Sequence, residues 1–119
     1  MQDNKTNRVF FSACLTEGYR SCAKDIKNAL RENGIVVEKK IRNTKDIWAR
    51  DYMPIQIGEN KFMRYMYRPD YLWKVESNRQ YITDNAQCDF LTGKEIVDCN
   101  VILDGGNVVI CGNKMILTE

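Results

Sequence analysis

The chain has 119 residues, of which 44% are hydrophobic and 29% are charged, and its formal net charge is +2. These values are typical of one globular domain, and so small a charge argues against nucleic acid or a membrane surface as the main partner. No apolar run is long enough to span a membrane, and residues 1–5 lack the apolar centre of a signal peptide. We therefore expect a cytoplasmic protein.

The five cysteines and the absence of histidine limit the chemistry. The cysteines have no C-x-x-C spacing and are Cys14, Cys22, Cys88, Cys99 and Cys111. We therefore expect free thiols in a reducing compartment, with neither a bound metal nor a cofactor. Without histidine, Ser-His-Asp or Cys-His catalytic machinery cannot be complete within this chain.

The first forty residues predict a strand, a helix and a second strand. Residues 8–15 form a short apolar run typical of a buried strand. Residues 19–33 place apolar side chains at the spacing of one helix face, and Gly34 suits the helix end. Residues 35–41 are again apolar and β-branched. Short joints between these elements predict a parallel strand pair and an α/β fold.

The segment Thr44–Pro54 concentrates two aspartates, an arginine and a tryptophan just before a proline. In an extended chain, the even spacing of Asp46, Trp48 and Arg50 would direct all three to one side. Asp51 would face the other way unless the chain turns there. We predict a loop that feeds a strand, where site residues are common. The alternative is an Asp-capped turn with a buried tryptophan and one Arg–Asp ion pair.

Two hairpins are predicted further along the chain. In the first, strands at 54–57 and 61–67 flank Gly58–Asn60; in the second, strands at 108–111 and 114–117 flank Gly112–Asn113.

The segment between the hairpins predicts an exposed loop over 74–80, a short helix over 83–91 and a strand over 101–103. The aromatic and basic run 64–73 could stack single-stranded nucleic acid, or could be a strand followed by a rim loop. With so small a net charge, we favour the strand and rim loop.

The two hairpins repeat one another at a constant offset of 53 residues. The matched pairs include Asp51 with Asp104, Ile55 with Val108, Asn60 with Asn113 and Lys61 with Lys114. Units of this size, each unable to bury its own apolar face, are typical of propellers and other ring-like repeat folds.

Two stretches resemble signatures of the agmatine deiminase and bacterial peptidylarginine deiminase family. Residues Asp46–Pro54 are similar to its D-x-W-x-R-D-x-x-P signature, and Leu103–Val109 to its [ED]-G-G-N signature. The final Leu117-Thr118-Glu119 resembles a third, L-T-T-E. The resemblance implies an α/β fold of ββαβ-type units around a pseudo-fivefold axis, a pentein-like propeller. Residues 1–119 would be a single N-terminal fragment holding about two of the five units, near 8–67 and 81–119.

The resemblance also implies the roles of individual residues. Asp51 and Asp104 would be the catalytic carboxylates that bind a guanidinium, with Trp48 and Asn107 as further substrate contacts. Asp46, Arg50, Gly105 and Gly106 would be structural residues near the site. This arrangement suits a guanidinium, because carboxylates bind it in a bidentate way and an indole face attracts cations.

The family reaction hydrolyses a guanidinium to a ureido group plus ammonia, with a cysteine nucleophile and a histidine. This chain has no histidine, and none of its cysteines resembles the family's nucleophile, so we expect it to be inactive alone. The expected substrate is agmatine, arginine or a peptide arginine. The expected partner is the remainder of the fold or a self-associated copy. The alternative is a non-catalytic module that binds a guanidinium or amine, or that forms oligomers.

Overall fold

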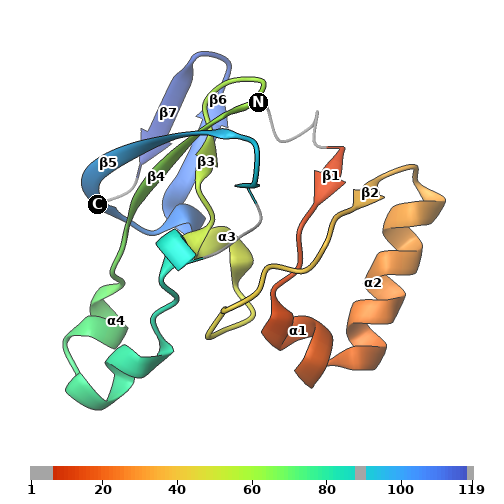
Figure 1. Cartoon of the computed structure of the whole chain (residues 1–119), viewed down its shortest axis with the longest axis horizontal. Helices are drawn as coiled ribbons and strands as arrows, with labels where there is room; N and C mark the ends of the chain where they lie inside the picture. Colours follow the sequence, from red (N-terminus) through yellow and green to blue (C-terminus); the bar gives the residue numbers. More distant parts are fainter. Residues whose placement is uncertain (1–6, 88–90, 118–119) are drawn as a thin grey trace.

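A strand, a helix and a strand form the first lobe, as the apolar pattern predicts (Figure 1). The computed structural model describes residues 7–87 and 91–117. Strands β1 (Arg8–Val9) and β2 (Val36–Val37) pair in parallel, and α2 (Arg20–Glu32) lies between them in the sequence. The predicted helix and the predicted parallel pair are confirmed, although both strands are shorter than expected.

The predicted strand over residues 8–15 is wrong in its second half, where α1 (Ala13–Gly18) begins. The reason is local, because Ser12 Oγ accepts a hydrogen bond of 2.9 Å from the Leu15 amide and caps the helix. Ser12 is also fully buried and forms an isolated parallel bridge with Ile41. Its side chain therefore ends the extended segment despite the apolar run around it.

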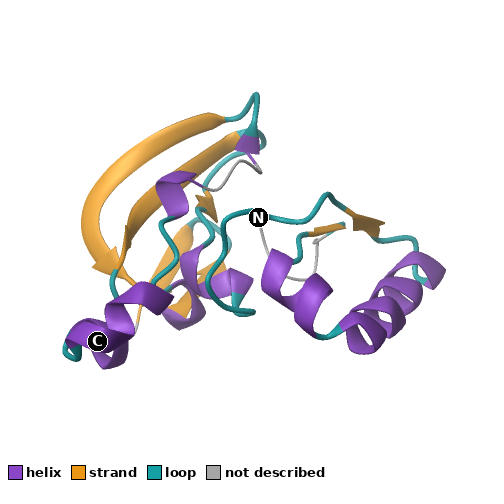
Figure 2. Cartoon of the chain, turned by 60° about the horizontal axis from the view of Figure 1, so that its bottom comes forward, coloured by secondary structure: helices purple, strands orange, loops and turns teal. Residues whose placement is uncertain are grey.

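The second lobe contains a three-stranded sheet and a separate hairpin, and both predicted hairpins are confirmed (Figure 2). Strands β3 (Ile55–Gln56) and β4 (Lys61–Tyr67) are antiparallel, and β5 (Glu95–Leu103) adds to β4 in parallel. Strands β6 (Val108–Cys111) and β7 (Lys114–Leu117) form the second hairpin. Strand β5 starts earlier than the predicted Val101 because it extends along most of β4.

The two hairpins follow the same sequence offset but differ in register by one residue. Ile55 lies opposite Met63, and adding 53 to both numbers gives Val108 and Ile116. Val108 instead lies opposite Leu117. The difference arises at the turns, because the second hairpin closes through two residues, with Gly112 at a φ of 62°. The repeat therefore extends to the hairpin topology but not to identical strand pairing.

The segment after β4 is helical over much of its length, and the exposed loop predicted over 74–80 is instead an exposed 3-10 helical turn. It contains α4 (Asp70–Trp73), the 3-10 helix η2 (Glu76–Tyr81) and the short 3-10 helix η3 (Asn85–Gln87). The indole of Trp73 lies 4.9 Å from the Arg68 guanidinium and 4.6 Å from that of Arg79, which organises these turns. Of the helix predicted over 83–91, residues 85–87 form η3, and residues 88–90 lie outside the described part of the chain.

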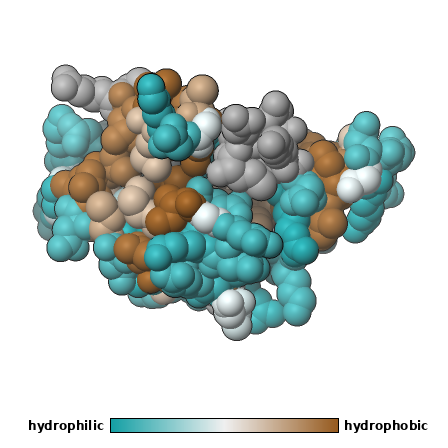
Figure 3. All heavy atoms as spheres, turned by 90° about the horizontal axis from the view of Figure 1, so that it is seen from above, coloured by the Kyte–Doolittle hydropathy of each residue, from teal (hydrophilic) through white to brown (hydrophobic). Residues whose placement is uncertain are grey.

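The main core lies under α3 (Ala49–Tyr52) and the strands of the second lobe. Its buried members are Ile41, Tyr52, Ile55, Tyr65, Tyr67 and Val108. Much other apolar surface stays exposed, including Val101 of β5 and Ile116 of β7. Figure 3 shows hydrophobic side chains gathered mainly toward the left of the face in view, with a smaller group near its right edge. No helix in the described residues is long and apolar enough to cross a membrane.

Four of the cysteines are free thiols. Cys14 and Cys99 are half-buried, and Cys22 and Cys111 are exposed. Cys88 lies outside the described residues.

Candidate functional site

The loop before β3 turns at Asp46 and then forms the single helical turn α3. Asp46 Oδ1 accepts a hydrogen bond of 2.8 Å from the Trp48 amide, and the Met53 amide donates to the Ala49 carbonyl at 2.9 Å. The predicted extended conformation of residues 46–50 is therefore wrong. The predicted aspartate cap is confirmed, and so is the loop that feeds a strand, because β3 begins directly after Pro54.

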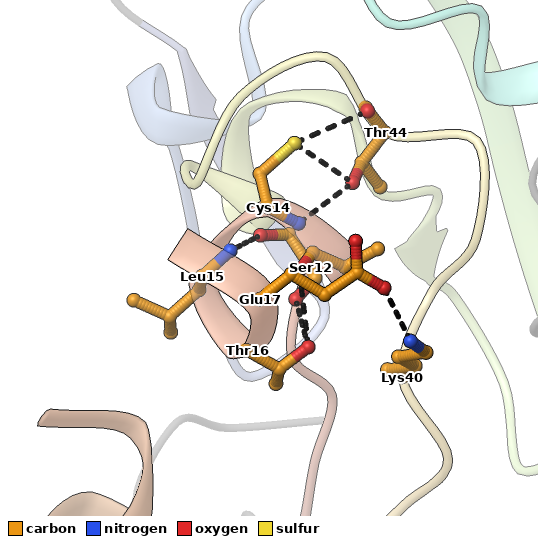
Figure 4. A network of polar contacts seen from close by, with 8 residues as sticks. Ser12, Cys14, Leu15, Thr16, Glu17, Lys40 and Thr44 are labelled. Atoms are coloured by element: carbon orange, nitrogen blue, oxygen red, sulfur yellow. Dashed lines mark hydrogen bonds and ion pairs between the residues drawn. The ribbon is translucent and has the colours of Figure 1, made fainter. Parts of the chain in front are cut away.

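The residues that lead into this loop are attached to two neighbouring elements. Thr44 is buried, and its carbonyl accepts a hydrogen bond of 3.2 Å from the Cys14 thiol (Figure 4). The Cys14 amide donates to Thr44 Oγ1 at 3.4 Å, and the Lys45 amide donates to Thr83 Oγ1 at 2.9 Å. Helix α1 and the segment before η3 therefore hold the residues that immediately precede Asp46.

The second signature forms a tight turn, η5 (Gly105–Asn107), directly after β5. Asp104 Oδ1 accepts a hydrogen bond of 2.9 Å from the Gly106 amide, and the Asp104 carbonyl accepts one of 2.9 Å from the Asn107 amide. The backbone amide of Asn107, a residue predicted to contact the substrate, thus closes this turn. The Asn107 residue itself is exposed.

The two glycines allow this turn to approach α3 closely. A Cβ on Gly105 would lie 2.1 Å from the Arg50 carbonyl oxygen and 2.4 Å from the Tyr65 hydroxyl. A Cβ on Gly106 would lie 2.6 Å from Asp51 Oδ1 and 3.1 Å from Asp104 Oδ1. Any side chain at either position would therefore separate the two loops or their carboxyl groups.

The structure brings Asp51 and Asp104 together, although they are 53 residues apart in the sequence. Partial burial raises the pKa of Asp51 to about 6, with further contributions from the charges of Asp104 and Asp46 and a hydrogen bond with the Asp104 side chain. Burial also raises the pKa of Asp46, and the Asp104 charge adds to this rise. The three carboxyl groups thus form one region of negative potential, in which ionisation of Asp51 is unfavourable.

Arg50 contacts the second hairpin. Its Nη2 donates a hydrogen bond of 3.0 Å to the Val108 carbonyl, at the start of β6. Its positive charge also lowers the pKa of Asp51, which limits the rise caused by burial and by the other aspartates. Arg50 therefore connects α3 to the second hairpin, through a backbone carbonyl.

Tyr65 of β4 belongs to the site but was not predicted from the sequence. Its hydroxyl donates a hydrogen bond of 2.6 Å to the Asp51 carbonyl, and the residue is 2% exposed. Burial raises the pKa of Tyr65, and the charges of Asp104 and Asp51 add to the rise. The available signal was the alternation of β4, because a tyrosine on the buried face of a strand needs a partner for its hydroxyl.

Trp48 lies on the same loop as Asp46 and Asp51 but does not pack into the core. It is 64% exposed, so most of its indole surface is open to solvent. This excludes the buried tryptophan of the alternative prediction.

None of the three carboxyl groups of the acidic region lines the cavity beside β4 and β5. Within residues 7–87 and 91–117, no three His, Cys, Asp or Glu side chains converge well enough to hold a metal ion. A cavity of about 560 Å³ lies along β4 and β5, and none of the predicted site residues lines it. In that cavity the Arg64 guanidinium donates two hydrogen bonds to the Asp98 carboxylate, from Nε at 2.6 Å and from Nη2 at 3.0 Å.

No family model matches the chain, and neither the curated proteins nor the solved structures contain a significant match.

Proposed function

We propose that this chain is the N-terminal portion of a guanidine-hydrolysing deiminase of the agmatine deiminase and peptidylarginine deiminase type. Asp51 and Asp104 bind the guanidinium nitrogens, and Trp48 covers the cation. The reaction converts agmatine, arginine or a peptide arginine to a ureido product plus ammonia in the cytoplasm. The fold of the whole enzyme is a pentein-like propeller, to which this chain contributes about two units.

The proposal rests on the approach of the Asp51 and Asp104 carboxyl groups. The resemblance of the sequence to both family signatures names these two residues, and in the fold a Cβ added at Gly106 would lie 2.6 Å from Asp51 Oδ1 and 3.1 Å from Asp104 Oδ1. Two like charges at this spacing repel each other, and a planar cation that accepts both removes the repulsion. A guanidinium has the shape and the permanent charge for this role.

The chain supplies binding and orientation, and the bond-breaking groups come from elsewhere. With no histidine among its 119 residues, it lacks the proton-transfer group that the family reaction uses. General acid–base help is typically worth about 10²–10⁴-fold, and a covalent nucleophile divides the difficult step in two. The missing histidine equally favours the alternative, a non-catalytic module that binds a guanidinium or amine.

Calorimetric titration of the purified chain with agmatine tests the proposal. We expect weak binding, with a Kd in the range of about 1 mM, because an open site has a high dielectric constant. Asp51→Asn and Asp104→Asn should each weaken binding by about tenfold or more. Asp98→Asn is the matched control, because Asp98 pairs with Arg64 away from the site.

The same samples should release no ammonia from agmatine or arginine. Equal loss of binding in Asp51→Asn and Asp98→Asn would contradict the proposed site. Ammonia release that disappears in Asp51→Asn would contradict the assigned roles, because a chain without histidine would then perform the chemistry.

A further inference from the structure

Tyr65 connects the two aspartate loops through one hydroxyl group. The hydroxyl donates to the Asp51 carbonyl at 2.6 Å. On the other side it faces the backbone of Gly105, and this contact partly offsets the rise in the pKa of Tyr65. The hydroxyl is so close that a Cβ on Gly105 would lie 2.4 Å from it. One side chain of β4 thus contacts the backbone of both signatures.

Tyr65 is itself held at an irregularity of the sheet. Arg64 lies opposite Asp98, but Met66 lies opposite Ile102, so β5 bulges beside Tyr65. A bulge interrupts the ladder and leaves backbone groups to be satisfied by other partners. Asn85 supplies one, because its Nδ2 donates a hydrogen bond of 2.9 Å to the Tyr65 carbonyl. Asn85 is buried, so this contact is shielded from water.

Tyr67 shows that burial alone does not account for these contacts. It lies two residues further on the same strand and is 7% exposed, and its ring packs edge-to-face on Tyr52 at 5.9 Å. Its buried hydroxyl forms no hydrogen bond with any described residue; the Tyr71 hydroxyl approaches it outside hydrogen-bonding geometry. Tyr65 and Tyr67 are therefore both buried, but only the Tyr65 hydroxyl contacts the loops that carry Asp51 and Asp104.

We propose that Tyr65 is a positioning residue that fixes the spacing between Asp51 and Asp104, with Asn85 fixing Tyr65 in turn. The functional value of this positioning rests on the proposed function, because a guanidinium that binds both carboxyls requires a fixed distance between them. The positioning itself is independent of any ligand. It follows from the hydrogen bond between Tyr65 and Asp51 and from the close approach of the Tyr65 hydroxyl to Gly105.

The coupling between the two aspartates tests the proposal without a ligand. Carboxyl NMR of the full chain gives the pKa of Asp51 with and without Asp104→Asn, in the wild-type, Tyr65→Phe and Tyr67→Phe backgrounds. We expect Asp104→Asn to lower the pKa of Asp51 by about one in the wild type and in Tyr67→Phe. In Tyr65→Phe we expect at most about half that effect, because the carboxyls are no longer held together. Equal coupling in all three backgrounds would overturn the proposal.

Agmatine titration of the same variants separates this inference from the proposed function. We expect Tyr65→Phe to weaken agmatine binding by about tenfold, and Tyr67→Phe to leave it unchanged. If the wild-type chain binds no agmatine, the proposed function fails, and the NMR result still decides whether Tyr65 positions the aspartates.

If Tyr65→Phe does not fold, Asn85→Ala is used in its place. The effect of Asp104→Asn on the pKa of Asp51 should then be smaller in Asn85→Ala than in Tyr67→Phe. Undiminished coupling in Asn85→Ala would contradict the proposed chain of contacts.

Discussion

The Asp51 carboxyl lies where the folded chain disfavours its charge. Its pKa rises from 3.8 to about 6, first through burial and then through Asp104 and Asp46. The folded chain therefore holds a proton that the unfolded chain releases between about pH 4 and pH 6. The stability that comes from this proton is fully present below about pH 4 and is lost as the pH rises through about 6. A cation bound to the carboxyls would favour the charged form of Asp51 and so lower its pKa.

Asp51→Asn should consequently stabilise the chain at pH 7.5 and have little effect at pH 4. We expect a gain of about 1 kcal/mol in the free energy of unfolding, after allowing for solvent screening of a half-buried carboxyl. Urea unfolding at the two pH values measures it. Asp98→Asn should do the opposite, because its ion pair with Arg64 lowers the pKa of Asp98, and that stability is lost as the pH falls. A loss of stability in Asp51→Asn at pH 7.5 would contradict this account.

Two short motifs in the sequence predicted part of the candidate site. Asp51, Asp104 and the two glycines follow from the two signatures, because carboxylates and close backbone approach leave a pattern in the sequence. For Tyr65, the only signal in the sequence was the alternation of buried and exposed residues along its strand. Its partners Asp51 and Gly105 are 14 and 40 residues away along the chain. Such contacts depend on the strand register, which the sequence did not specify.

The two signatures are brought together by the contact between α3 and η5. At Gly105 the neighbour of an added Cβ would be the backbone oxygen of Arg50, at 2.1 Å, which cannot move alone. At Gly106 the neighbour would be the side-chain oxygen of Asp51, at 2.6 Å, which can rotate away. Substitutions at these two glycines should therefore affect different properties.

Gly106→Ala should keep the fold but separate the carboxyls, with a stability loss below about 1 kcal/mol. We expect the pKa of Asp51 to fall by about one at most, because rotation moves the carboxyl away from Asp104, whereas burial is the larger cause of the rise. Agmatine affinity should decrease by about tenfold. Gly18→Ala is the control, since no atom lies within 4 Å of its added Cβ. Carboxyl NMR and titration measure both effects, and an unchanged pKa would contradict the geometry.

Elements with strong local signals were predictable, and those set by distant contacts were not. The spacing of apolar residues gave α2, and Gly112-Asn113 gave the second hairpin. Ser12 ended a strand that its apolar neighbours favoured, because its side chain bonded to the Leu15 amide. The one-residue difference in hairpin register arose from turn geometry, which the matched positions Ile55 and Val108 did not reveal.

For the whole molecule, the second lobe exposes apolar strand surface. Ile116 of β7 is 57% exposed, and in the described residues β7 pairs with β6 alone. Unpaired edges and exposed apolar strands favour association between copies. The repeat pattern leads to the same prediction, because each unit of a repeat fold needs a neighbour to cover its apolar face.

We therefore expect the purified chain to self-associate as its concentration rises, as seen by sedimentation velocity. Ile116→Lys should reduce the association, because a charge on β7 opposes strand pairing. Val36→Lys is the matched control, since Val36 is 48% exposed but belongs to the first lobe. Equal effects of the two substitutions would indicate non-specific aggregation, and a monomer at all concentrations would contradict the prediction.

The central claim is that the Asp51 and Asp104 carboxyls form a guanidinium site, and the pKa of Asp51 with and without ligand tests it most directly. Carboxyl NMR of the wild-type chain should give a value near 6 without ligand. Saturating agmatine should lower it to about 4.5 or below, because a bound cation favours the charged carboxylate. Putrescine has two amines but no guanidinium, and at the same concentration it should lower the pKa of Asp51 much less. A pKa unchanged by agmatine, or lowered equally by putrescine, would contradict the account.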